Sequence, residues 1–479
     1  MMTLTQALGW TSHTGSSVRL CGDASLRICR VHTDTRTVQP GDLFVALKGD
    51  HFDAHDFLAQ ARATGATAAI AQHGLAAAGL PGLEVEDSKL ALGQLAAGWR
   101  SQFSLPLVAV TGSNGKTTVT QMIAAILQAW KQSAAFSTEG NLNNDIGVPL
   151  TLLRLNAAHE VGVVELGMNH PGEIAGLAKM VRPAVALVNN AQREHLEFMH
   201  TVSAVAHENG AVITALGEQG VAVFPADDEF TPVWRALAGI RKTITFAAPD
   251  QMDGHADITA KSIWADGVWK VQARTPAGAL TFTLAVAGRH NVKNALAAIA
   301  CALAVGVPLA AISAGLSAFV PVSGRSCATT LVAGTRVVTL IDDSYNANPD
   351  SMRAAIEVLA GLPGPRLLVM GDMAEVGNDG PAFHREAVAC ALLAGIDRIF
   401  SFGAQFAAVS AEFATLRHFN DLSQLQAAVG CEFSGVGSVL VKGSRSMKME
   451  RVVRTLTVLA SANEFGTTQH AITGATHAA

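Results

Sequence analysis

Short apolar runs alternate with longer, amphipathic runs through the middle of this chain, from about residue 101 to 320. The short runs are strand-like and end at glycine or polar residues; they are 107–110, 161–166 and 184–188. The longer runs have helical periodicity; they are 119–130, 171–181, 203–216 and 290–305. Alternation of this kind predicts a mostly parallel sheet with helices on both faces.

The same alternation returns after residue 320. Its strand-like runs are each followed by a helical run and lie at 337–341, 367–370, 398–402 and 439–441. This pattern predicts a second, doubly wound unit. Near the start of the chain, Leu4–Trp10 is expected to be a short helix, and Pro40–Leu47 a turn that leads into a strand.

These patterns predict an α/β protein with three domains. A small N-terminal α/β domain is expected at 1–100, a central domain with a mostly parallel sheet at 101–320, and a Rossmann-like C-terminal domain at 321–461. The length of 479 residues agrees with about three domains of ~150 residues each. Residues 462–479 are rich in Thr, Ala and Gly and are expected to form a disordered tail.

Composition narrows the class of protein. With 49% hydrophobic and 15% charged residues, the chain is globular, and a net charge of −5 without a basic run argues against nucleic-acid binding. The cysteines form no Cys-x-x-Cys unit and the start lacks a signal-peptide pattern, so we expect a cytoplasmic protein with reduced thiols. The uncharged stretch 295–324 has the length of a membrane span, but Gly306 and Pro308 interrupt it. We expect two buried helices there and no stable membrane insertion.

The residues between the first central strand and its helix suggest a phosphate-binding loop. Thr111–Thr118 reads Thr-Gly-Ser-Asn-Gly-Lys-Thr-Thr. Glycine allows close backbone approach, the N–H groups of a helix start bind oxyanions, Lys116 would reach the β/γ-phosphates, and the Thr117 hydroxyl would ligate Mg²⁺. The usual P-loop has a further glycine where this chain has Val110. The alternative is an ordinary strand–turn–helix link with a solvated lysine.

Polar clusters follow several predicted strands. Glu165 ends one central strand and His195 follows another, where an acid could complete a Mg²⁺ shell. Taken alone, a residue such as Glu165 is more often a strand-end acid paired with a lysine. In the C-terminal unit the clusters are Asp342–Pro349, Gly371–Glu375 and Lys442–Arg445. Because parallel strands end at one edge of a sheet, these clusters predict a ligand site there.

Thr33, Asp34, Thr35 and Arg36 form a further polar group in the first domain. Hydroxyls, a carboxylate and a guanidinium so close together could hold a polar ligand, with Arg36 suited to phosphate. An Asx-type turn with a surface arginine explains the same residues.

Several of these segments resemble the Mur ligase family, over about residues 30 to 455. The phosphate-binding loop is similar to the family's ATP loop, and Glu165–Met168 to its Mg²⁺ acid motif. The segments Gly140–Leu150, Gly288–Asn294 and Asp342–Pro349 are similar to its muramoyl-peptide, nucleotide and third-domain motifs. Gly324–Arg325 and Asp343 match positions near ATP and the acyl phosphate.

The resemblance implies a role for each candidate residue. Expected ATP contacts are Thr111, Gly112, Ser113, Asn114, Gly115, Lys116, Thr117, Thr118, Asn291, Asn294 and Asp343. Expected substrate contacts are Thr33, Asp34, Thr35, Arg36, Asn141, Asn143, Asn144, Tyr345, Asn346, Asn348, Lys442, Ser444 and Arg445. Expected catalytic groups are Lys116, Glu165, His195 and Arg325. Tyr345 could equally be a core residue.

One position departs from the family pattern. Many members carry a carbamylated lysine fourteen residues after the histidine, and this chain has Asn209 there. We hypothesise that the adjacent Glu208 supplies the missing carboxylate, which makes Thr117, Glu165, His195 and Glu208 the expected Mg²⁺ ligands.

The resemblance also implies an activity, an ATP-dependent amide ligation that proceeds through an acyl phosphate. The third-domain motifs are most similar to those of members that add D-alanyl-D-alanine to UDP-N-acetylmuramoyl-tripeptide in peptidoglycan synthesis. The first domain would then bind the UDP-sugar, the third domain the dipeptide, and the protein would act as a monomer. Members that add the third peptide residue, folylpolyglutamate synthase and an ATP-driven switch remain alternatives.

Overall fold

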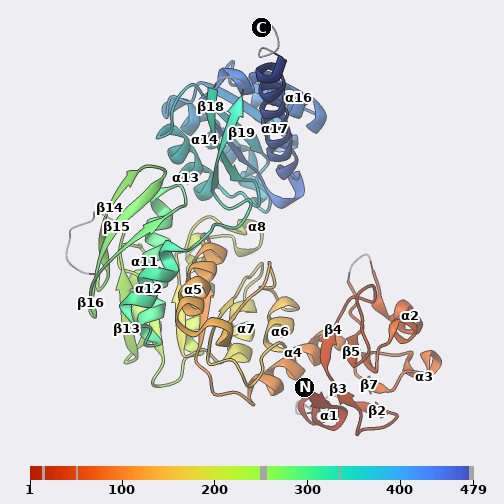
Figure 1. Ribbon diagram of the computed structural model, residues 1–479. Coiled ribbons are helices and arrows are strands. Elements are labelled where there is room, and N and C mark those ends of the chain that lie inside the picture. Colours follow the sequence, from red (N-terminus) through yellow and green to blue (C-terminus); the bar gives the residue numbers. More distant parts are fainter. Residues whose placement is uncertain (13–16, 50–51, 249–255, 334–335, 474–479) are drawn as a thin grey trace.

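The structure, a computed structural model, describes residues 1–479 except 13–16, 50–51, 249–255, 334–335 and 474–479. Three α/β domains follow one another along the chain. The N-terminal domain lies beside the central domain, and the C-terminal domain lies on another side of the central domain (Figure 1).

The N-terminal domain is built around a small sheet with strand order β2-β7-β6-β5-β4, in which all neighbours except β2 and β7 are parallel. Its elements are β1 (Met2–Thr3), α1 (Leu4–Thr11), β2 (Arg19–Cys21), β3 (Arg27–Ile28), β4 (Arg30–His32), β5 (Asp42–Val45), η1 (Ala54–Phe57), α2 (Leu58–Thr64), β6 (Ala68–Ala71), α3 (Leu75–Ala78), β7 (Gly82–Glu84) and α4 (Ser88–Arg100). The helix and the strand predicted at its start are confirmed as α1 and β5.

The central domain carries the predicted parallel sheet, with strand order β13-β12-β11-β8-β10-β9. Its strands and first helices are β8 (Leu107–Thr111), α5 (Lys116–Lys131), η2 (Gln132–Ala134), β9 (Ala135–Ser137), α6 (Gly147–Leu152), β10 (Val161–Glu165), α7 (Glu173–Val181), β11 (Val185–Val188), α8 (Leu196–Met199), α9 (Val202–Thr214), β12 (Val221–Pro225), α10 (Thr231–Ala238) and β13 (Lys242–Phe246). An antiparallel sheet that the sequence patterns did not predict follows, formed by β14 (Thr259–Ala265), β15 (Val268–Thr275) and β16 (Gly278–Leu284).

Helices cover both faces of the central sheet, as predicted. Successive residues of a strand pack alternately into two hydrophobic clusters, one on each face of the sheet. In β8, Val108 and Val110 pack into the cluster formed with α5, α11 (Arg289–Ala304) and α12 (Leu309–Ser317). Leu107 and Ala109 pack into the cluster on the other face, with α6, α7 and α9. Successive strand residues point to opposite faces, so a fully apolar strand is the expected sequence for a sheet covered on both sides.

Helix α5 places the loop that precedes it. Its buried residues recur at helical spacing, namely Val119, Met122, Ile123, Ile126 and Leu127. The small residues of α12 allow this helix to pack closely, because a Cβ on Gly315 would lie 2.4 Å from the Ile126 Cα. The uncharged stretch 295–324 thus contains the end of α11 and all of α12, as predicted, and no helix among the described residues combines the length and apolar character needed to cross a membrane.

The first domain is anchored to the central domain through α4. Leu92 and Leu95 of α4 share a hydrophobic cluster with Leu152 of α6 and Leu177 of α7. The buried Arg100 at the end of α4 donates to the Val181 carbonyl at 2.9 Å. Burial and the nearby Arg182 charge lower the pKa of Arg100 to about 10.

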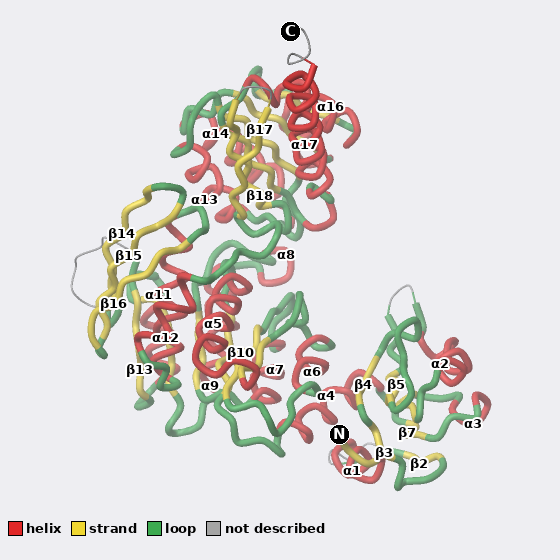
Figure 2. Tube along the Cα trace, in the orientation of Figure 1, coloured by secondary structure: helices red, strands yellow, loops and turns green. Residues whose placement is uncertain are grey.

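The C-terminal domain contains the predicted second doubly wound sheet, with strand order β17-β18-β22-β19-β20-β21 and only the β17–β18 edge pair antiparallel within the described residues. Figure 2 shows its strands between helices. Its elements are β17 (Cys327–Ala333), β18 (Arg336–Asp343), α13 (Pro349–Ala360), β19 (Arg366–Gly371), η3 (Gly377–Asp379), α14 (Gly380–Leu393), β20 (Arg398–Phe402), α15 (Ala404–Ser410), β21 (Leu416–Phe419), α16 (Leu422–Glu432), η4 (Phe433–Gly435), β22 (Ser438–Lys442), η5 (Arg445–Met447) and α17 (Glu450–Thr473).

The end of the chain differs from the prediction of a disordered tail from residue 462. The backbone continues as helix α17 to Thr473. Leu456 and Ala460 pack this helix into a hydrophobic cluster of the C-terminal domain, and no proline follows that would end the helix. Residues 474–479 lie outside the described residues.

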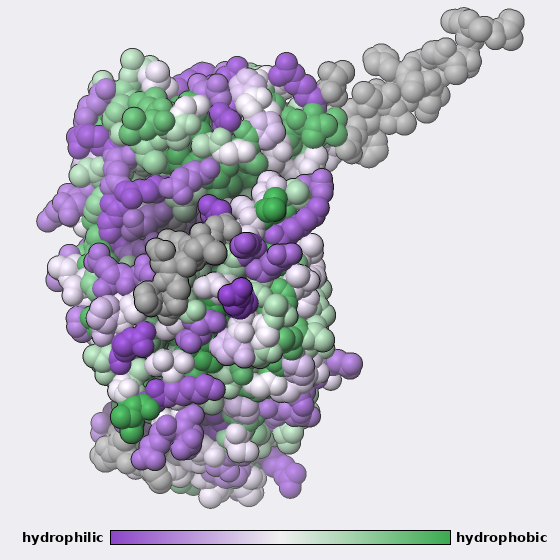
Figure 3. Space-filling view, turned by 90° about the vertical axis from the view of Figure 1, so that its left-hand side faces the viewer, coloured by the Kyte–Doolittle hydropathy of each residue, from purple (hydrophilic) through white to green (hydrophobic). Residues whose placement is uncertain are grey.

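The surface is mixed in character. On the face shown in Figure 3, hydrophilic residues form broad bands with hydrophobic residues between them.

Candidate active site

A cavity of about 1340 Å³ lies where the central and C-terminal domains meet. Sequence-predicted residues from both domains line it: Ser113, Asn114, Gly115, Lys116, Thr117, Thr118, Asn141, Asn143, Asn144, Glu165, His195, Asn291, Asn294, Arg325, Asp343, Tyr345, Asn346, Lys442 and Arg445. The predicted residues that do not line it, all within the described part of the chain, are Thr33, Asp34, Thr35, Arg36, Thr111, Gly112, Glu208, Asn348 and Ser444.

The loop between β8 and α5 has the shape of a phosphate cradle. Gly112 and Gly115 have φ of +135° and +82°, in the region that glycine adopts without strain. A Cβ on Gly115 would lie 2.6 Å from the Asn294 Oδ1 atom, so space also requires glycine. The first N–H groups of α5 have no partner inside the helix, and they face the cavity. Val110, where P-loops usually have glycine, is a buried β8 residue.

Side-chain amides hold this loop in place. The Asn209 Oδ1 atom accepts from the Thr111 hydroxyl at 2.5 Å and from the Gly112 N–H at 3.1 Å. The Asn190 Oδ1 atom accepts from the Asn114 N–H at 2.8 Å. The loop is therefore fixed by neighbouring elements before any ligand arrives, and these amides were not predicted from the sequence.

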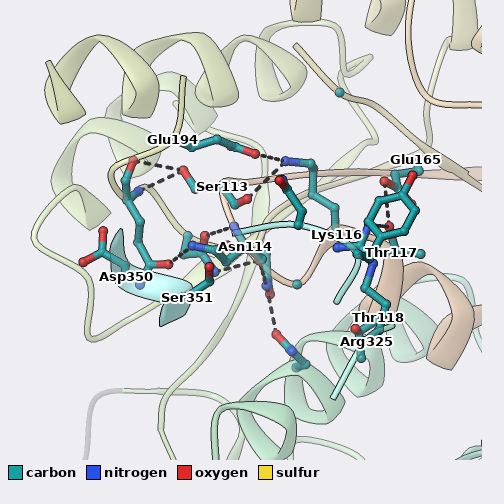
Figure 4. A pocket seen from close by; sticks show the side chains of 18 of the residues that line it. Ser113, Asn114, Lys116, Thr117, Thr118, Glu165, Glu194, Arg325, Asp350 and Ser351 are labelled. Carbon is teal, nitrogen blue, oxygen red and sulfur yellow. Dashed lines mark hydrogen bonds and ion pairs between the residues drawn. The ribbon is translucent and has the colours of Figure 1, made fainter. Parts of the chain in front are cut away.

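Lys116 is held at the loop by three acceptors. Its Nζ atom donates to the Gly112 carbonyl at 2.6 Å and to the Ser113 carbonyl at 3.2 Å, and it forms an ion pair with Glu194 Oε1 at 2.7 Å (Figure 4). The Glu194 residue is only 6% exposed. Its acidic side chain next to His195 was visible in the sequence, but nothing there indicated that it would meet Lys116.

Glu165 lies on the other side of the loop. In the sheet, β10 places Glu165 beside Val110. Its Oε1 atom accepts from the Thr117 hydroxyl at 3.1 Å and from the Asn143 amide at 2.7 Å, and both donors are neutral. A buried carboxylate with neutral donors beside a hydroxyl provides the oxygen ligands that Mg²⁺ prefers. The residues therefore fit a magnesium ion better than a carboxylate–lysine pair.

No group of three His, Cys, Asp or Glu side chains in the described residues is arranged to hold a metal ion alone. A Mg²⁺ ion usually keeps one or two carboxylates and takes its remaining ligands from water and substrate phosphates. The cavity thus suits a cation that binds together with a nucleotide.

His195 connects the central domain to the C-terminal domain. Its Nδ1 atom lies 2.5 Å from Glu375 Oε2, and its Nε2 atom lies 3.5 Å from Glu194 Oε1. Burial opposes the charged ring, but the two carboxylates outweigh burial and raise the pKa of His195 to about 9. His195 also holds the pKa of Glu375 below its usual range. Both residues have positive φ, +51° and +59°.

Arg193 makes the most extensive contact between these two domains among the described residues. Its guanidinium donates to Asp350 at 2.6 Å and to Glu386 at 2.7 Å, and its backbone N–H also donates to Asp350. Glu386 pairs in addition with Arg353. Neither Arg193 nor its partners were predicted as site residues.

Two of the three predicted C-terminal clusters, Asp342–Pro349 and Lys442–Arg445, meet at the cavity, whereas residues of the third, Gly371–Glu375, line a separate pocket. Lys442 Nζ forms an ion pair with Asp343 at 2.6 Å and donates to the Asn346 carbonyl at 2.9 Å. Burial would raise the pKa of Asp343, but Lys442 outweighs it and keeps the pKa lowered. The Tyr345 ring has the guanidiniums of Arg325 and Arg445 at 4.1 and 5.4 Å from its centroid, so Tyr345 is a cavity residue rather than a core residue.

Two predicted substrate residues, Asn348 and Ser444, do not line the cavity but form hydrogen bonds with the loops around it. Asn348 caps helix α13 and exchanges hydrogen bonds with Asn114, at 2.9 and 3.3 Å. The buried Ser444 hydroxyl accepts from the Ala374 N–H at 2.7 Å, which holds the loop after β19.

The polar group Thr33–Arg36 forms a turn in the first domain, away from this cavity. Asp34 accepts from the Arg36 backbone at 3.0 Å and pairs with its guanidinium at 2.6 Å, and these bonds lower the pKa of Asp34 to about 2. The Asx-type turn is therefore present. The Arg36 side chain is 82% exposed, which leaves it accessible to a ligand.

The structure corrects the role expected of Glu208. Its two carboxylate oxygens accept from the Gly172 and Ile174 N–H groups, both at 2.8 Å. These are the first N–H groups of helix α7, which needs acceptors and favours negative charge. Glu208 is thus a helix cap outside the cavity, and a metal role is not assigned to it.

Models of one protein family match three consecutive segments of this chain, and two of them include residues that line the cavity. Family models match residues 27–100 (Mur ligase family, catalytic domain), 110–302 (Mur ligase middle domain) and 329–445 (Mur ligase, glutamate ligase domain). The chain is 44% identical over 435 residues to the UDP-N-acetylmuramoyl-tripeptide–D-alanyl-D-alanine ligase of Escherichia coli strain K12, covering 90% of this chain and 94% of the relative.

Solved structures agree with this match. A crystal structure of MurF from Acinetobacter baumannii superposes with a TM-score of 0.85 at 34% identity, covering 95% of this chain and 98% of that chain. The MurF ligase from Thermotoga maritima in complex with ADP superposes with a TM-score of 0.77 at 27% identity, covering 91% and 98%.

Proposed function

This chain belongs to the Mur ligase family, and we propose that it joins D-alanyl-D-alanine to the terminal carboxylate of UDP-N-acetylmuramoyl-tripeptide in peptidoglycan precursor synthesis. ATP drives the ligation and leaves as ADP and phosphate, and the reaction takes place in the cytoplasm. The observation that carries this proposal is the cavity itself. It brings the phosphate-binding loop, Glu165 and the polar strand ends of the C-terminal domain to one place.

The chemistry explains why these parts must meet. A free carboxylate does not condense with an amine in water, because its oxygen is a poor leaving group. Transfer of the γ-phosphoryl group of ATP to that oxygen gives an acyl phosphate. The dipeptide amine then attacks the carbonyl through a tetrahedral intermediate, and phosphate leaves with the former carboxylate oxygen.

The loop side of the cavity supports phosphoryl transfer. Such a transfer requires positioning and charge neutralisation rather than a protein nucleophile. Lys116, the N–H groups at the start of α5 and Arg325 supply donors and positive charge on one side of the cavity. Thr117, Glu165 and His195 would hold Mg²⁺, which neutralises phosphate charge when bound.

Two further walls of the cavity suit the muramoyl peptide and the incoming dipeptide. Asn141, Asn143 and Asn144 line the wall expected to meet the muramoyl peptide. Tyr345, Asn346, Lys442 and Arg445 line the C-terminal wall, where cationic side chains can hold the dipeptide carboxylate. The exposed Arg36, with Thr33, Asp34 and Thr35, would bind the UDP portion in the first domain.

A ligation assay tests this function. Purified protein is incubated with ATP, Mg²⁺ and UDP-N-acetylmuramoyl-tripeptide, with D-alanyl-D-alanine, glutamate or diaminopimelate as the amine, and product masses are measured. We expect an amide product and ADP only with D-alanyl-D-alanine. A product with another amine would assign a different ligation, and ATP hydrolysis without any amide product would indicate a nucleotide-driven switch.

A further inference from the structure

The side chain of Asn348, an expected substrate contact, is buried at the boundary between the central and C-terminal domains. Asn348 is 7% exposed and precedes helix α13, just after a cluster that lines the C-terminal wall of the cavity. Its amide forms two hydrogen bonds with the phosphate-binding loop of the central domain. The Asn348 Nδ2 atom donates to the Asn114 Oδ1 atom at 2.9 Å, and the Asn114 Nδ2 atom donates to the Asn348 Oδ1 atom at 3.3 Å.

The helix that Asn348 caps fixes the orientation of this amide. The Asn348 Oδ1 atom accepts from the Ser351 N–H at 2.8 Å, and the Asn348 N–H donates to the Ser351 hydroxyl at 3.0 Å. Only the oxygen of a side-chain amide can accept, so the cap assigns the Oδ1 position and leaves the Nδ2 group to donate to Asn114. The contact between the two domains is therefore built into the start of α13.

The loop end of this contact is held by the central domain alone. The Asn114 N–H donates to the Asn190 Oδ1 atom, and the Asn189 Nδ2 atom donates to the Asn114 carbonyl, both at 2.8 Å. These bonds do not involve the C-terminal domain, so the backbone of the loop keeps its shape without Asn348. The loop is thus a fixed reference point, and Asn348 attaches the C-terminal domain to it.

We propose that Asn348 is a positioning residue of the ligation, which acts through Asn114 to place the C-terminal wall of the cavity against the phosphate-binding loop. The inference rests on the proposed function, because an acyl phosphate formed at the loop must meet an amine held by that wall. Asp343 and Asn346 of this wall precede Asn348 by only five and two positions. A shift of α13 against the loop therefore moves the wall, and a misplacement of ~1 Å can lower a rate ~10²-fold.

Two other roles would explain the same contacts, and each makes a different prediction. As a helix cap alone, Asn348 would be replaced well by serine, which caps helices about as well but has no group to donate to Asn114. As a docking contact alone, Asn348 would only raise the fraction of molecules with joined domains. Saturating dipeptide restores joined domains by binding to them, so a docking defect raises KM and spares kcat. A misplaced wall lowers kcat even at saturation.

The experiment compares steady-state ligation by the wild type and Asn348→Ser, with ATP and UDP-N-acetylmuramoyl-tripeptide saturating and D-alanyl-D-alanine varied. We expect Asn348→Ser to lower kcat at least tenfold. Its affinity for ADP, measured by calorimetry, should stay within threefold of the wild type, because the loop keeps its bonds within the central domain. Asp421→Ser is the matched control, because it also places serine at a cap of the C-terminal domain, the exposed N-cap of α16. The control should have the kcat of the wild type.

A double variant tests whether Asn348 acts through Asn114. If it does, Asn114→Ala combined with Asn348→Ser should have the kcat of the slower single variant, whereas multiplied losses would overturn the proposal. A kcat of Asn348→Ser within threefold of the wild type, or ADP affinity lowered more than threefold, would also overturn it. If Asn348→Ser does not fold, Asn348→Asp keeps the cap without the Nδ2 donor, and an unchanged kcat there would overturn it too. A wild type that forms no amide would instead contradict the proposed function.

Discussion

Replacing Arg193 by methionine should loosen the C-terminal domain from the central domain. The Arg193 guanidinium forms hydrogen bonds with Asp350 at 2.6 and 3.1 Å and with Glu386 at 2.7 and 3.0 Å, across the domain boundary. Methionine keeps the apolar length of the side chain but removes every one of these donors. The backbone N–H of residue 193 can still donate to Asp350.

The size of the effect follows from the burial of the pair. The side chains of Arg193 and Asp350 are 20% and 19% exposed. Breaking a buried pair typically costs 3–5 kcal/mol, whereas an exposed pair contributes about 0–1 kcal/mol. Glu386 keeps Arg353 as a partner, so the loss comes mainly from Asp350. We expect about 2 kcal/mol, which corresponds to a roughly 30-fold larger separated population.

Amide hydrogen exchange followed by mass spectrometry can measure the fraction of molecules in which the two domains are separated. The Glu197 N–H donates to the Glu375 carbonyl across the same boundary. When reclosing is faster than exchange, the exchange rate of this N–H is proportional to the separated population. Peptides covering 196–200 should therefore exchange roughly 30-fold faster in Arg193→Met than in the wild type.

Arg385→Met provides a matched control for the loss of one guanidinium. Arg385 pairs with Glu412 through two hydrogen bonds of 2.7 Å, but both residues belong to the C-terminal domain and are nearly half exposed. Exchange in peptides 196–200 should not change in this variant. An increase of less than about threefold in Arg193→Met would refute the reasoning, because it corresponds to less than about 0.7 kcal/mol.

Three further predictions concern single side chains. Lys116→Ala should lower ligation turnover by at least ~10²-fold, as for other pre-placed charge donors, and near-normal turnover would contradict its role. The contacts of His195 with Glu194 and Glu375 should together contribute roughly 3 kcal/mol at most in metal-free protein. Because the folded pKa of His195 is raised from 6.5 to about 9, this stability is fully present below pH 6.5 and lost as the pH rises through 9. Urea unfolding of wild type and His195→Gln should converge at high pH, and a constant difference would argue against the charged ring. Glu208→Ala should reduce the free energy of unfolding by about 1 kcal/mol, and an unchanged value would argue against the α7 cap.

The sequence predicted the architecture well because its signals were local. Fully apolar strands and alanine-rich helices follow from sheets covered on both faces, and the glycines of Thr111–Thr118 are required by backbone shape. The antiparallel sheet β14–β16 went unpredicted although a local signal for it exists. Its strands alternate buried and exposed residues, and the two residues Asp266–Gly267, both with positive φ, form the turn between β14 and β15.

The site was predicted less completely, because contacts between distant residues decide it. Glu194 and Asn209 became important only when the fold brought them to the loop, 78 and 98 residues away from Lys116 and Thr111. Glu208 illustrates the reverse case. It is adjacent to Asn209 in the sequence, but one step along a helix turns a side chain by about 100°, which directs its carboxylate to α7 instead of the cavity.

The meeting of His195 and Glu375 has a consequence for how the two domains part. Each residue has a left-handed backbone, which is unfavourable by roughly 1 kcal/mol for a residue with a side chain. Glycine would remove this tension at either position but would also delete the ring or the acid that joins them, and a β-branched residue would worsen it. His195 and Glu375 therefore each keep a functional side chain on a left-handed backbone that is unfavourable for it. If separation lets either backbone relax, the released strain offsets part of the lost contact and favours reopening of the cavity.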